Sequence, residues 1–121
     1  MKKYRLTEME TRLAELIWIN EPIPSGQLVI LCQKEFGWKK STTYTMLKRL
    51  VNKGTFENVN SVVTSLIKKD EFYSAQSKLF VDETFEGSLP RFVAAFTRNK
   101  RLSEKEIEEL QRLIEEHKEE L

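Results

Sequence analysis

The chain has 121 residues, of which 40% are hydrophobic and 32% charged, and a formal net charge of +1. This composition is that of an ordinary folded protein and excludes a disordered or fibrous chain. The longest apolar run, Leu28–Cys32, is far shorter than the roughly 18 residues that a membrane-spanning helix needs. No apolar run typical of a signal peptide follows the basic N-terminus. We therefore expect a cytoplasmic protein without membrane insertion, and the single Cys32 agrees with a reducing compartment.

The net charge hides an asymmetry along the chain. Residues 1–53 carry 10 Lys or Arg against 5 Glu, which gives +5. Residues 54–121 carry 10 Lys or Arg against 14 Asp or Glu, which gives −4. This division indicates that only the first half contacts a polyanion.

Two helices are predicted at the N-terminal end. Thr7 and Glu10 form a capping box, so the first helix begins directly after Thr7. Glu21–Pro24 contains two prolines and ends that helix in an extended link. Ser25 is then expected to cap a second helix that runs to about Glu35.

A third helix is predicted from Lys40 or Ser41 to Lys53, where Gly54 closes it. Its apolar face is formed by Thr43, Met46, Leu47 and Leu50. After Gly54 the period changes, and Thr55–Asn58 and Val62–Ile67 have the composition of strands on either side of a turn. Three helices followed by a hairpin make a winged helix-turn-helix domain, which we place at residues 1–69.

The remaining residues, 70–121, are predicted to be helical, so the fold class is mainly α with a small β-hairpin. Asp70 is expected to cap a helix that ends at Gly87, and Ser88 begins a short helix with Phe92, Val93 and Phe96 buried. A second capping box at Ser103 opens a last helix with apolar residues at heptad-like spacing.

The third predicted helix carries an unusual set of charges. The segment from Lys39 to Lys53 holds five basic residues and no acidic one, in a chain that is almost one-third charged. Hydroxyl side chains near a helix N-terminus suit phosphate oxygens, and Lys or Arg further along reach phosphates or guanine edges. A basic helix face can also serve solubility alone. Its place before a hairpin favours DNA binding, because winged folds insert this helix into the major groove.

The hairpin is weakly equipped for the same task. Asn58, Asn60 and Ser61 at its tip could bond phosphates, but no Lys or Arg lies between Gly54 and Ile67. A wing that contacts DNA and a wing that only supports the fold both fit this sequence.

With these elements assigned, nearly the whole chain resembles the penicillinase repressor (BlaI/MecI/CopY) family of bacterial regulators. The resemblance is carried by Leu6–Glu10, Ile17-Trp18, Trp38–Gly54, Phe80–Leu89, Phe92–Phe96 and Leu102–Leu110. It implies a winged-helix repressor in the bacterial cytoplasm, associated with the nucleoid, that blocks transcription as a homodimer on a dyad operator in double-stranded DNA. The DNA-binding residues predicted from the helix and the resemblance are Lys39, Lys40, Ser41, Thr42, Tyr44, Thr45, Lys48 and Arg49.

The resemblance also implies that residues 70–121 form the dimer interface. The apolar content of this region agrees, because its bulky side chains exceed what three short helices bury against themselves. The predicted interface residues are Phe72, Leu79, Phe80, Phe85, Phe92, Phe96, Leu110 and Leu113. An ordinary core within one chain is the alternative reading of this stripe.

In antibiotic-responsive members of the family, a membrane sensor protease triggers cleavage of the repressor at an Asn-Phe bond in a tail helix. The corresponding pair here is Ala95-Phe96, which makes it the candidate cleavage site, although alanine replaces the asparagine. Copper-responsive members carry a cysteine cluster near the C-terminus, and residues 70–121 contain no cysteine. His117 stands alone, whereas a metal site needs three or four converging ligands, so we predict no metal site and no cofactor.

An enzyme is not predicted, because the chain has no phosphate-binding glycine loop, HExxH or nucleophile elbow. The alternative that the residues leave open is a winged helix that serves as a protein-interaction module. In that case the basic third helix would dock an acidic partner instead of DNA.

Overall fold

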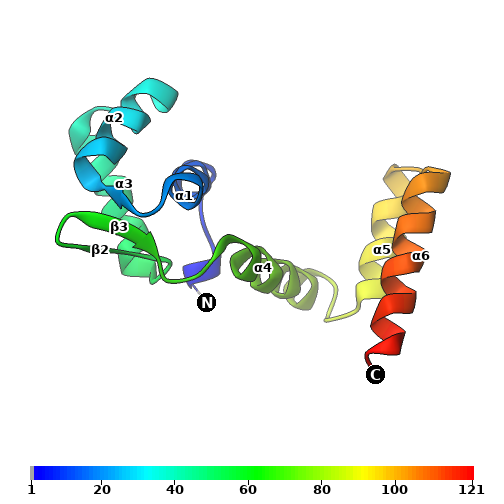
Figure 1. Ribbon diagram of the computed structural model, residues 1–121. Coiled ribbons are helices and arrows are strands. Elements are labelled where there is room, and N and C mark those ends of the chain that lie inside the picture. The colour runs from blue at the N-terminus through cyan, green and yellow to red at the C-terminus, as the bar shows by residue number, and fades with distance from the viewer. Residues whose placement is uncertain (1) are drawn as a thin grey trace. The chain divides into compact units, whose positions relative to one another are not determined.

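The computed structural model describes residues 2–121 and divides into two compact units, which we call the N-terminal unit, ending at Leu79, and the C-terminal unit, from Phe80 to Leu121. The elements of the N-terminal unit are η1 (Lys2–Tyr4), α1 (Glu8–Asn20), β1 (Ile23–Pro24), α2 (Ser25–Phe36), α3 (Lys40–Lys53), β2 (Phe56–Val59), β3 (Val62–Ser65) and the first part of α4 (Lys69–Thr84). The C-terminal unit holds the end of α4, then α5 (Leu89–Asn99) and α6 (Glu104–Glu119). The predicted fold class, mainly α with a small hairpin, is confirmed (Figure 1).

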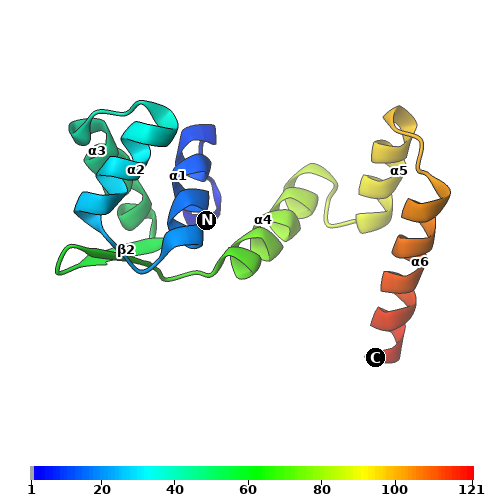
Figure 2. The ribbon, with the colours of Figure 1, turned by 45° about the horizontal axis from the view of Figure 1, so that its top comes forward.

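Helices α1, α2 and α3 gather on one side of a three-stranded antiparallel sheet with strand order β1-β3-β2 (Figures 1 and 2). The capping box at α1 is present as predicted: Thr7 Oγ1 accepts from the Glu10 N–H, and Glu10 Oε1 accepts from the Thr7 N–H. Gly37 ends α2 and Gly54 ends α3 in the left-handed conformation, at φ values of 69° and 85°. Glycine suits both places because it lacks the Cβ that disfavours positive φ.

The prediction that the Ser25 side chain caps α2 is wrong. Ser25 is the first residue of the helix rather than its cap, and the cap position belongs to Pro24, which makes no side-chain bond there. The cause is β1, a two-residue strand that the sequence analysis treated as an extended link. Its pairing with β3 continues one step further, so that the Ser25 N–H donates to the Ser61 carbonyl at 2.8 Å.

The wing is a hairpin with a two-residue loop. Val59 pairs with Val62, and Asn60 and Ser61 between them have φ values of 52° and 61°. Two consecutive residues at positive φ match the right-handed twist of the flanking strands, which is why such loops favour residues like asparagine. The second strand was predicted to reach Ile67, but it ends at Ser65.

The side chain of Glu21 explains why β3 ends at Ser65. Its carboxylate accepts from both the Ser65 N–H and the Ser65 Oγ–H at 2.8 Å. The next two backbone N–H groups, of Leu66 and Ile67, both donate to the Thr55 carbonyl, so the regular ladder stops.

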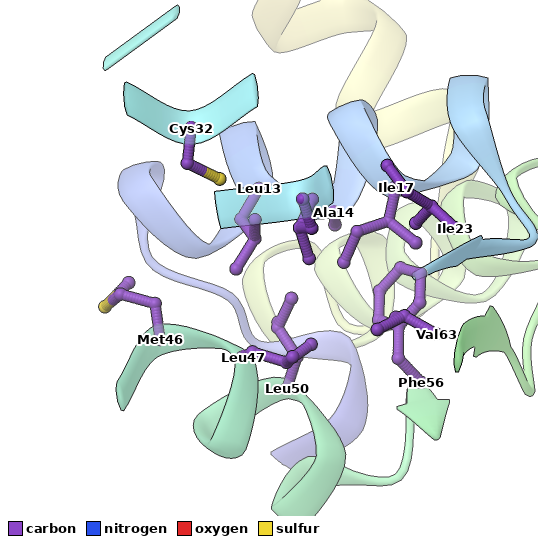
Figure 3. Close-up of a cluster of buried hydrophobic side chains, with 11 residues drawn as sticks. Leu13, Ala14, Ile17, Ile23, Cys32, Met46, Leu47, Leu50, Phe56 and Val63 are labelled. Atoms are coloured by element: carbon purple, nitrogen blue, oxygen red, sulfur yellow. The ribbon is translucent and has the colours of Figure 1, made fainter. Parts of the chain in front are cut away.

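The core of the N-terminal unit draws on all three helices and all three strands (Figure 3). Its buried members are Leu13, Ala14, Ile17, Ile23, Leu28, Cys32, Met46, Leu47, Leu50, Phe56 and Val63. Three of these residues, Met46, Leu47 and Leu50, lie on the predicted inner face of α3, and Thr43 on the same face is buried as well, as expected. Because that face is committed to the core, the opposite face of α3 is left to solvent.

An aromatic cluster joins α4 to the N-terminal unit and corrects one prediction. Phe72 has 0% of its surface exposed, and its ring lies 5.4 Å from Trp18, 5.4 Å from Tyr73 and 5.7 Å from Tyr4 between centroids. A residue without exposed surface within one chain has none to bury against a second, so Phe72 is removed from the predicted dimer interface. Its place near the start of a tail helix hid this role.

Polar contacts fix the same helix at its first turns. The Trp18 indole N–H donates to the Ile67 carbonyl at 3.0 Å, and the Tyr73 hydroxyl donates to the Glu15 carboxylate, which also pairs with Lys69 at 2.9 Å. Burial and the Glu15 carboxylate together raise the pKa of Tyr73 to about 12. Helix α4 begins at Lys69, so Asp70 is not its cap but lies in its first turn, where the helix dipole still favours an acidic side chain.

In the C-terminal unit the predicted helix caps are correct, but the predicted burial of apolar side chains is not. Ser88 caps α5 and Ser103 forms a capping box on α6, as predicted. Phe92, Val93 and Phe96 were expected to be buried, but Phe92 is half-buried and the other two are exposed. The two helices have no third layer within the described part of this unit, so they cannot enclose their apolar faces.

An ion pair ties the start of α1 to the end of α3. Lys53 Nζ lies 2.7 Å from Glu10 Oε1 and donates to the Arg5 carbonyl at the same distance. Burial raises the pKa of Glu10, but its hydrogen bonds with Lys53 and Thr7 and the charge of Lys53 outweigh this effect and hold that pKa below its ordinary value.

We expect Glu10→Gln to lower the free energy of unfolding by about 1–3 kcal/mol at pH 7, because it leaves the charge of Lys53 without its partner. The pKa of Glu10 is lower in the folded than in the unfolded chain, so the stabilisation is complete above the unfolded pKa of about 4.3 and is lost as the pH falls through the folded value. Urea unfolding at pH 7 and at more acidic pH checks this, and the difference between variant and parent should shrink in acid.

Glu8→Gln is the matched control for that experiment. Glu8 is the first residue of α1, two positions before Glu10, and pairs with Arg12 at the surface, at 3.6 Å. Exposed pairs of this kind contribute little. Equal losses in the two variants would contradict the special role of Glu10.

Candidate nucleic-acid interface

The outward face of α3 is a continuous polar surface. Ser41, Thr45 and Lys48 follow one another at helical spacing and are all exposed. Thr42 and Arg49 lie on one flank of this stripe and Tyr44 on the other, in agreement with 3.6 residues per turn. Lys39, the cap residue, and Lys40, the first residue of the helix, are also exposed. The structure therefore brings all eight predicted DNA-binding residues to one end or one face of α3.

Asn52 belongs to the same stripe, and the sequence analysis missed it. It lies four residues after Lys48 and is exposed. Its amide carries both a donor and an acceptor, the pair that reads adenine in the major groove. Extending the period of Ser41, Thr45 and Lys48 by one more turn would have found it.

Not every basic residue of the segment lies on this face. Lys53 donates hydrogen bonds to Glu10 and to the Arg5 carbonyl, so it stabilises the fold and does not contribute its charge to the outward face of α3. Lys39, Lys40, Lys48 and Arg49 remain, and their side chains are exposed. Arg49 makes a weak contact with Met46 Sδ, at 3.7 Å, and its side chain is exposed. The exposed face thus carries four cations with no acidic residue among them.

Tyr44 is the most constrained side chain of the face. It is 36% exposed, and its hydroxyl lies 3.3 Å from Ser25 Oγ, at the start of α2. Ser25 in turn is bonded through its N–H to Ser61 in the loop of the wing. The outward face of α3 and the wing are therefore connected through one buried serine, a residue that was predicted only as a helix cap.

The tip of the wing is polar but neutral. Asn58, Asn60 and Ser61 are exposed there, together with the apolar side chains of Val59 and Val62. Glu57, the acidic residue nearest the tip, accepts from Thr64 Oγ1 at 3.4 Å on the paired strand. The wing thus offers hydrogen-bonding groups without a charge.

Comparison with known proteins identifies the family. A family profile described as penicillinase repressor matches residues 6–116. The chain is 30% identical to the penicillinase repressor of Bacillus licheniformis over 98% of this chain and 96% of that protein. It is 25% identical to the methicillin resistance regulatory protein MecI of Mammaliicoccus sciuri, with 93% and 95% covered, and 26% identical to a penicillinase repressor of Staphylococcus aureus, with 93% of each covered.

The chain belongs to the penicillinase repressor family. The resemblance found in the sequence is confirmed. A family of repressors consists of regulatory proteins, so the prediction that the chain is not an enzyme is confirmed by this membership as well.

The described residues, 2–121, show neither a membrane-spanning helix nor a metal-binding cluster. None of the helices described there is long and apolar enough to cross a membrane. Among the same residues, no three His, Cys, Asp or Glu side chains converge in a way that could hold a metal ion. His117 lies on exposed α6, 3.9 Å from Glu120.

Most of the exposed bulky apolar side chains of this penicillinase repressor homologue lie in the C-terminal unit. Phe80, Phe85, Phe92 and Phe96 form a chain of ring contacts with centroid distances of 5.5–6.1 Å. A groove of about 300 Å³ between α5 and α6 is lined by Phe92, Phe96, Leu110 and Leu113 together with neighbouring residues. Seven of the predicted interface residues remain once Phe72 is set aside. Four of them are exposed, namely Phe80, Phe96, Leu110 and Leu113. The other three, Leu79, Phe85 and Phe92, are half-buried.

The candidate cleavage pair lies in the second half of α5. Ala95 is half-buried and Phe96 is exposed. Both belong to regular helix, so the bond between them is not in an extended loop. Cleavage at this pair stays a prediction.

Proposed function

We propose that this chain is a DNA-binding transcriptional repressor whose α3 enters the major groove of an operator. The observation that carries the proposal is the outward face of α3, which presents four cations, three hydroxyl residues and Tyr44 with no acidic side chain among them. Hydroxyl groups and cations at the start of a helix bond phosphate oxygens, and Lys or Arg further along read guanine. Its relatives named penicillinase repressor and methicillin resistance regulatory protein support the same function.

We further propose that the repressor is a homodimer on a dyad operator. The support is the apolar surface of the C-terminal unit, where Phe96, Leu110 and Leu113 are exposed beside a groove. A twofold dimer would present two copies of α3 about 34 Å apart, one turn of DNA, or a multiple of that spacing. The dimerisation region proposed is residues 70–121 without Phe72, and the DNA-binding domain is residues 1–69.

The proposed location is the bacterial cytoplasm, in association with the nucleoid, as for any regulator that acts on chromosomal DNA. A membrane sensor protease is the proposed partner for induction, with Ala95-Phe96 as the bond to test. Mass spectrometry of the repressor recovered from induced cells would detect fragments that end at Ala95.

The function is tested by binding to duplex DNA at several salt concentrations. We expect affinity for both operator and random duplex to fall steeply between about 50 and 200 mM salt, because cations that bind phosphates release condensed counterions. A chain that docks an acidic protein instead would show little affinity for random duplex at either concentration, and that result would overturn the proposal.

We expect Arg49→Ala to weaken operator binding by about 1–3 kcal/mol and to leave folding nearly unchanged. Arg49 is exposed and its contact with Met46 Sδ is weak, so the stability of the chain does not depend on it. Gel-shift titration measures the affinity and thermal unfolding measures the stability.

Arg12→Ala is the matched control for this variant. Arg12 is also an exposed arginine, but it lies on α1 and pairs with Glu8. Its loss should leave both the operator affinity and its salt dependence close to those of the parent. If Arg49→Ala behaved like Arg12→Ala, the assignment of Arg49 to the DNA surface would be wrong.

A further inference from the structure

Three polar groups from distant parts of the chain form one connected line. The Tyr44 hydroxyl on α3 is hydrogen-bonded to Ser25 Oγ at 3.3 Å, and the Ser25 N–H donates to the Ser61 carbonyl at 2.8 Å. Tyr44 is exposed on the recognition face, and Ser61 is exposed in the loop of the wing. Ser25 between them is only 5% exposed.

The register of the sheet explains why Ser25 lies there. Strand β1 pairs antiparallel to β3, with Ile23 opposite Val63 and Pro24 opposite Val62. One step further, Ser25 is opposite Ser61. In an antiparallel pair the hydrogen bonds fall on alternate residues, so after Ile23 the next residue that can bond across is Ser25, and its bond to Ser61 fixes its backbone relative to the wing.

We propose that Ser25 is a positioning residue for DNA recognition, acting through Tyr44. Its buried hydroxyl holds the Tyr44 side chain in one orientation on the outward face of α3 and in a fixed relation to the loop of the wing. The inference rests on the proposed function, since it concerns how the same surface binds DNA. It adds an uncharged and almost fully buried residue, which a search for exposed or charged side chains would not find.

The physical reason is preorganisation. A tyrosine side chain that rotates freely must be ordered when it contacts DNA, which costs affinity, whereas one already held by a hydrogen bond is ordered in the free protein. Ser25 is suited to this because its own backbone is fixed as the first residue of α2 and by its bond to Ser61, which directly precedes β3. A side chain bonded to a mobile loop would give no such restraint.

The test compares Ser25→Ala, Tyr44→Phe and the double variant for operator affinity at one salt concentration. We expect Ser25→Ala to weaken binding about two- to tenfold, the range given by ordering one side chain. In the Tyr44→Phe background, which already lacks the hydroxyl, Ser25→Ala should cause no further loss. The cycle isolates the coupling between the two residues.

Two variants separate positioning from a general loss of stability. Thr55→Val removes another buried hydroxyl of the same unit, one that donates to the Lys3 carbonyl at 3.1 Å and bonds no residue of the recognition face. It should lower the unfolding temperature without changing operator affinity. Ser25→Thr keeps a hydroxyl at the key position, and where it folds it should restore binding relative to Ser25→Ala.

The outcomes are distinct from those that test DNA binding itself. If the unaltered chain binds neither operator nor random duplex, the proposed function fails. If it binds DNA and Ser25→Ala binds equally well, or if the loss is the same with and without the Tyr44 hydroxyl, the positioning role of Ser25 is overturned. Circular dichroism and thermal unfolding of each variant show that folded protein is being compared.

Discussion

The variant Leu113→Glu is expected to sediment as a single chain of 14.3 kDa, whereas the parent should sediment at twice that mass. Leu113 is 61% exposed on α6 and lines the groove between α5 and α6. A carboxylate at this place would be desolvated without a partner in the proposed dimer, which is strongly unfavourable. Within one chain the same carboxylate points to solvent, so the fold should be retained.

The loss of the dimer should carry a large loss of operator binding. A dimer binds the second half-site intramolecularly once the first is bound, and this linkage is worth about 10²–10⁴-fold in affinity. We therefore expect Leu113→Glu to weaken operator binding by a factor in that range and to affect an isolated half-site very little. Sedimentation and gel-shift titration at matched concentrations measure the two effects.

Ile19→Glu is the control for introducing a charge at an exposed aliphatic position. Ile19 is 74% exposed on α1, in the N-terminal unit and outside the proposed dimer surface. Its mass in solution and its operator affinity should match those of the parent. A parent chain that is monomeric, or a Leu113→Glu variant that is still dimeric, would contradict the proposed interface.

The sequence predicted those parts of the molecule that local chemistry determines. Thr7 and Ser103 cap their helices because hydroxyl groups satisfy the free N–H groups of a first turn, and that pattern is visible in four residues. The inner face of α3 was predicted because a period of 3.6 separates apolar from polar side chains without reference to the rest of the chain. The eight recognition residues follow as the complement of that face.

What the sequence did not reveal depends on contacts between distant segments. Strand β1 has two residues and exists only because β3 lies beside it, so neither its pairing nor the bond from Ser25 to Ser61 has a local signal. Lys53 is one of the five basic residues of the Lys39–Lys53 segment, but Glu10, 43 residues earlier, pairs with it. In each case the role of the residue depends on a contact with a distant segment, which its residue type and its neighbours in the sequence do not indicate.

Phe72 is the clearest example of this limit, and it gives the second large expected effect. The sequence places it among the apolar residues of the tail, where a dimer interface is the natural expectation. In the structure it is fully buried against Trp18, Tyr73 and Tyr4. The two assignments make opposite predictions for the same substitution.

We expect Phe72→Ala to lower the free energy of unfolding of the N-terminal unit by about 3–5 kcal/mol, the usual cost of removing a fully buried phenylalanine. This is a large part of the 5–15 kcal/mol that typically stabilises a folded domain. Both tryptophans of the chain, Trp18 and Trp38, lie in the N-terminal unit, so the midpoint of urea unfolding followed by tryptophan fluorescence reports on that unit.

Phe80→Ala provides the comparison, because Phe80 is a half-exposed phenylalanine of the C-terminal unit. It should shift the tryptophan midpoint little, since its ring packs against Phe85 and Phe92 of the C-terminal unit and buries less surface within the chain than Phe72 does. A Phe72→Ala variant with an unchanged midpoint but a reduced mass in solution would return Phe72 to the dimer interface. A lowered midpoint in a chain that is still dimeric under folding conditions would instead establish that Phe72, in the first part of α4, stabilises the N-terminal unit.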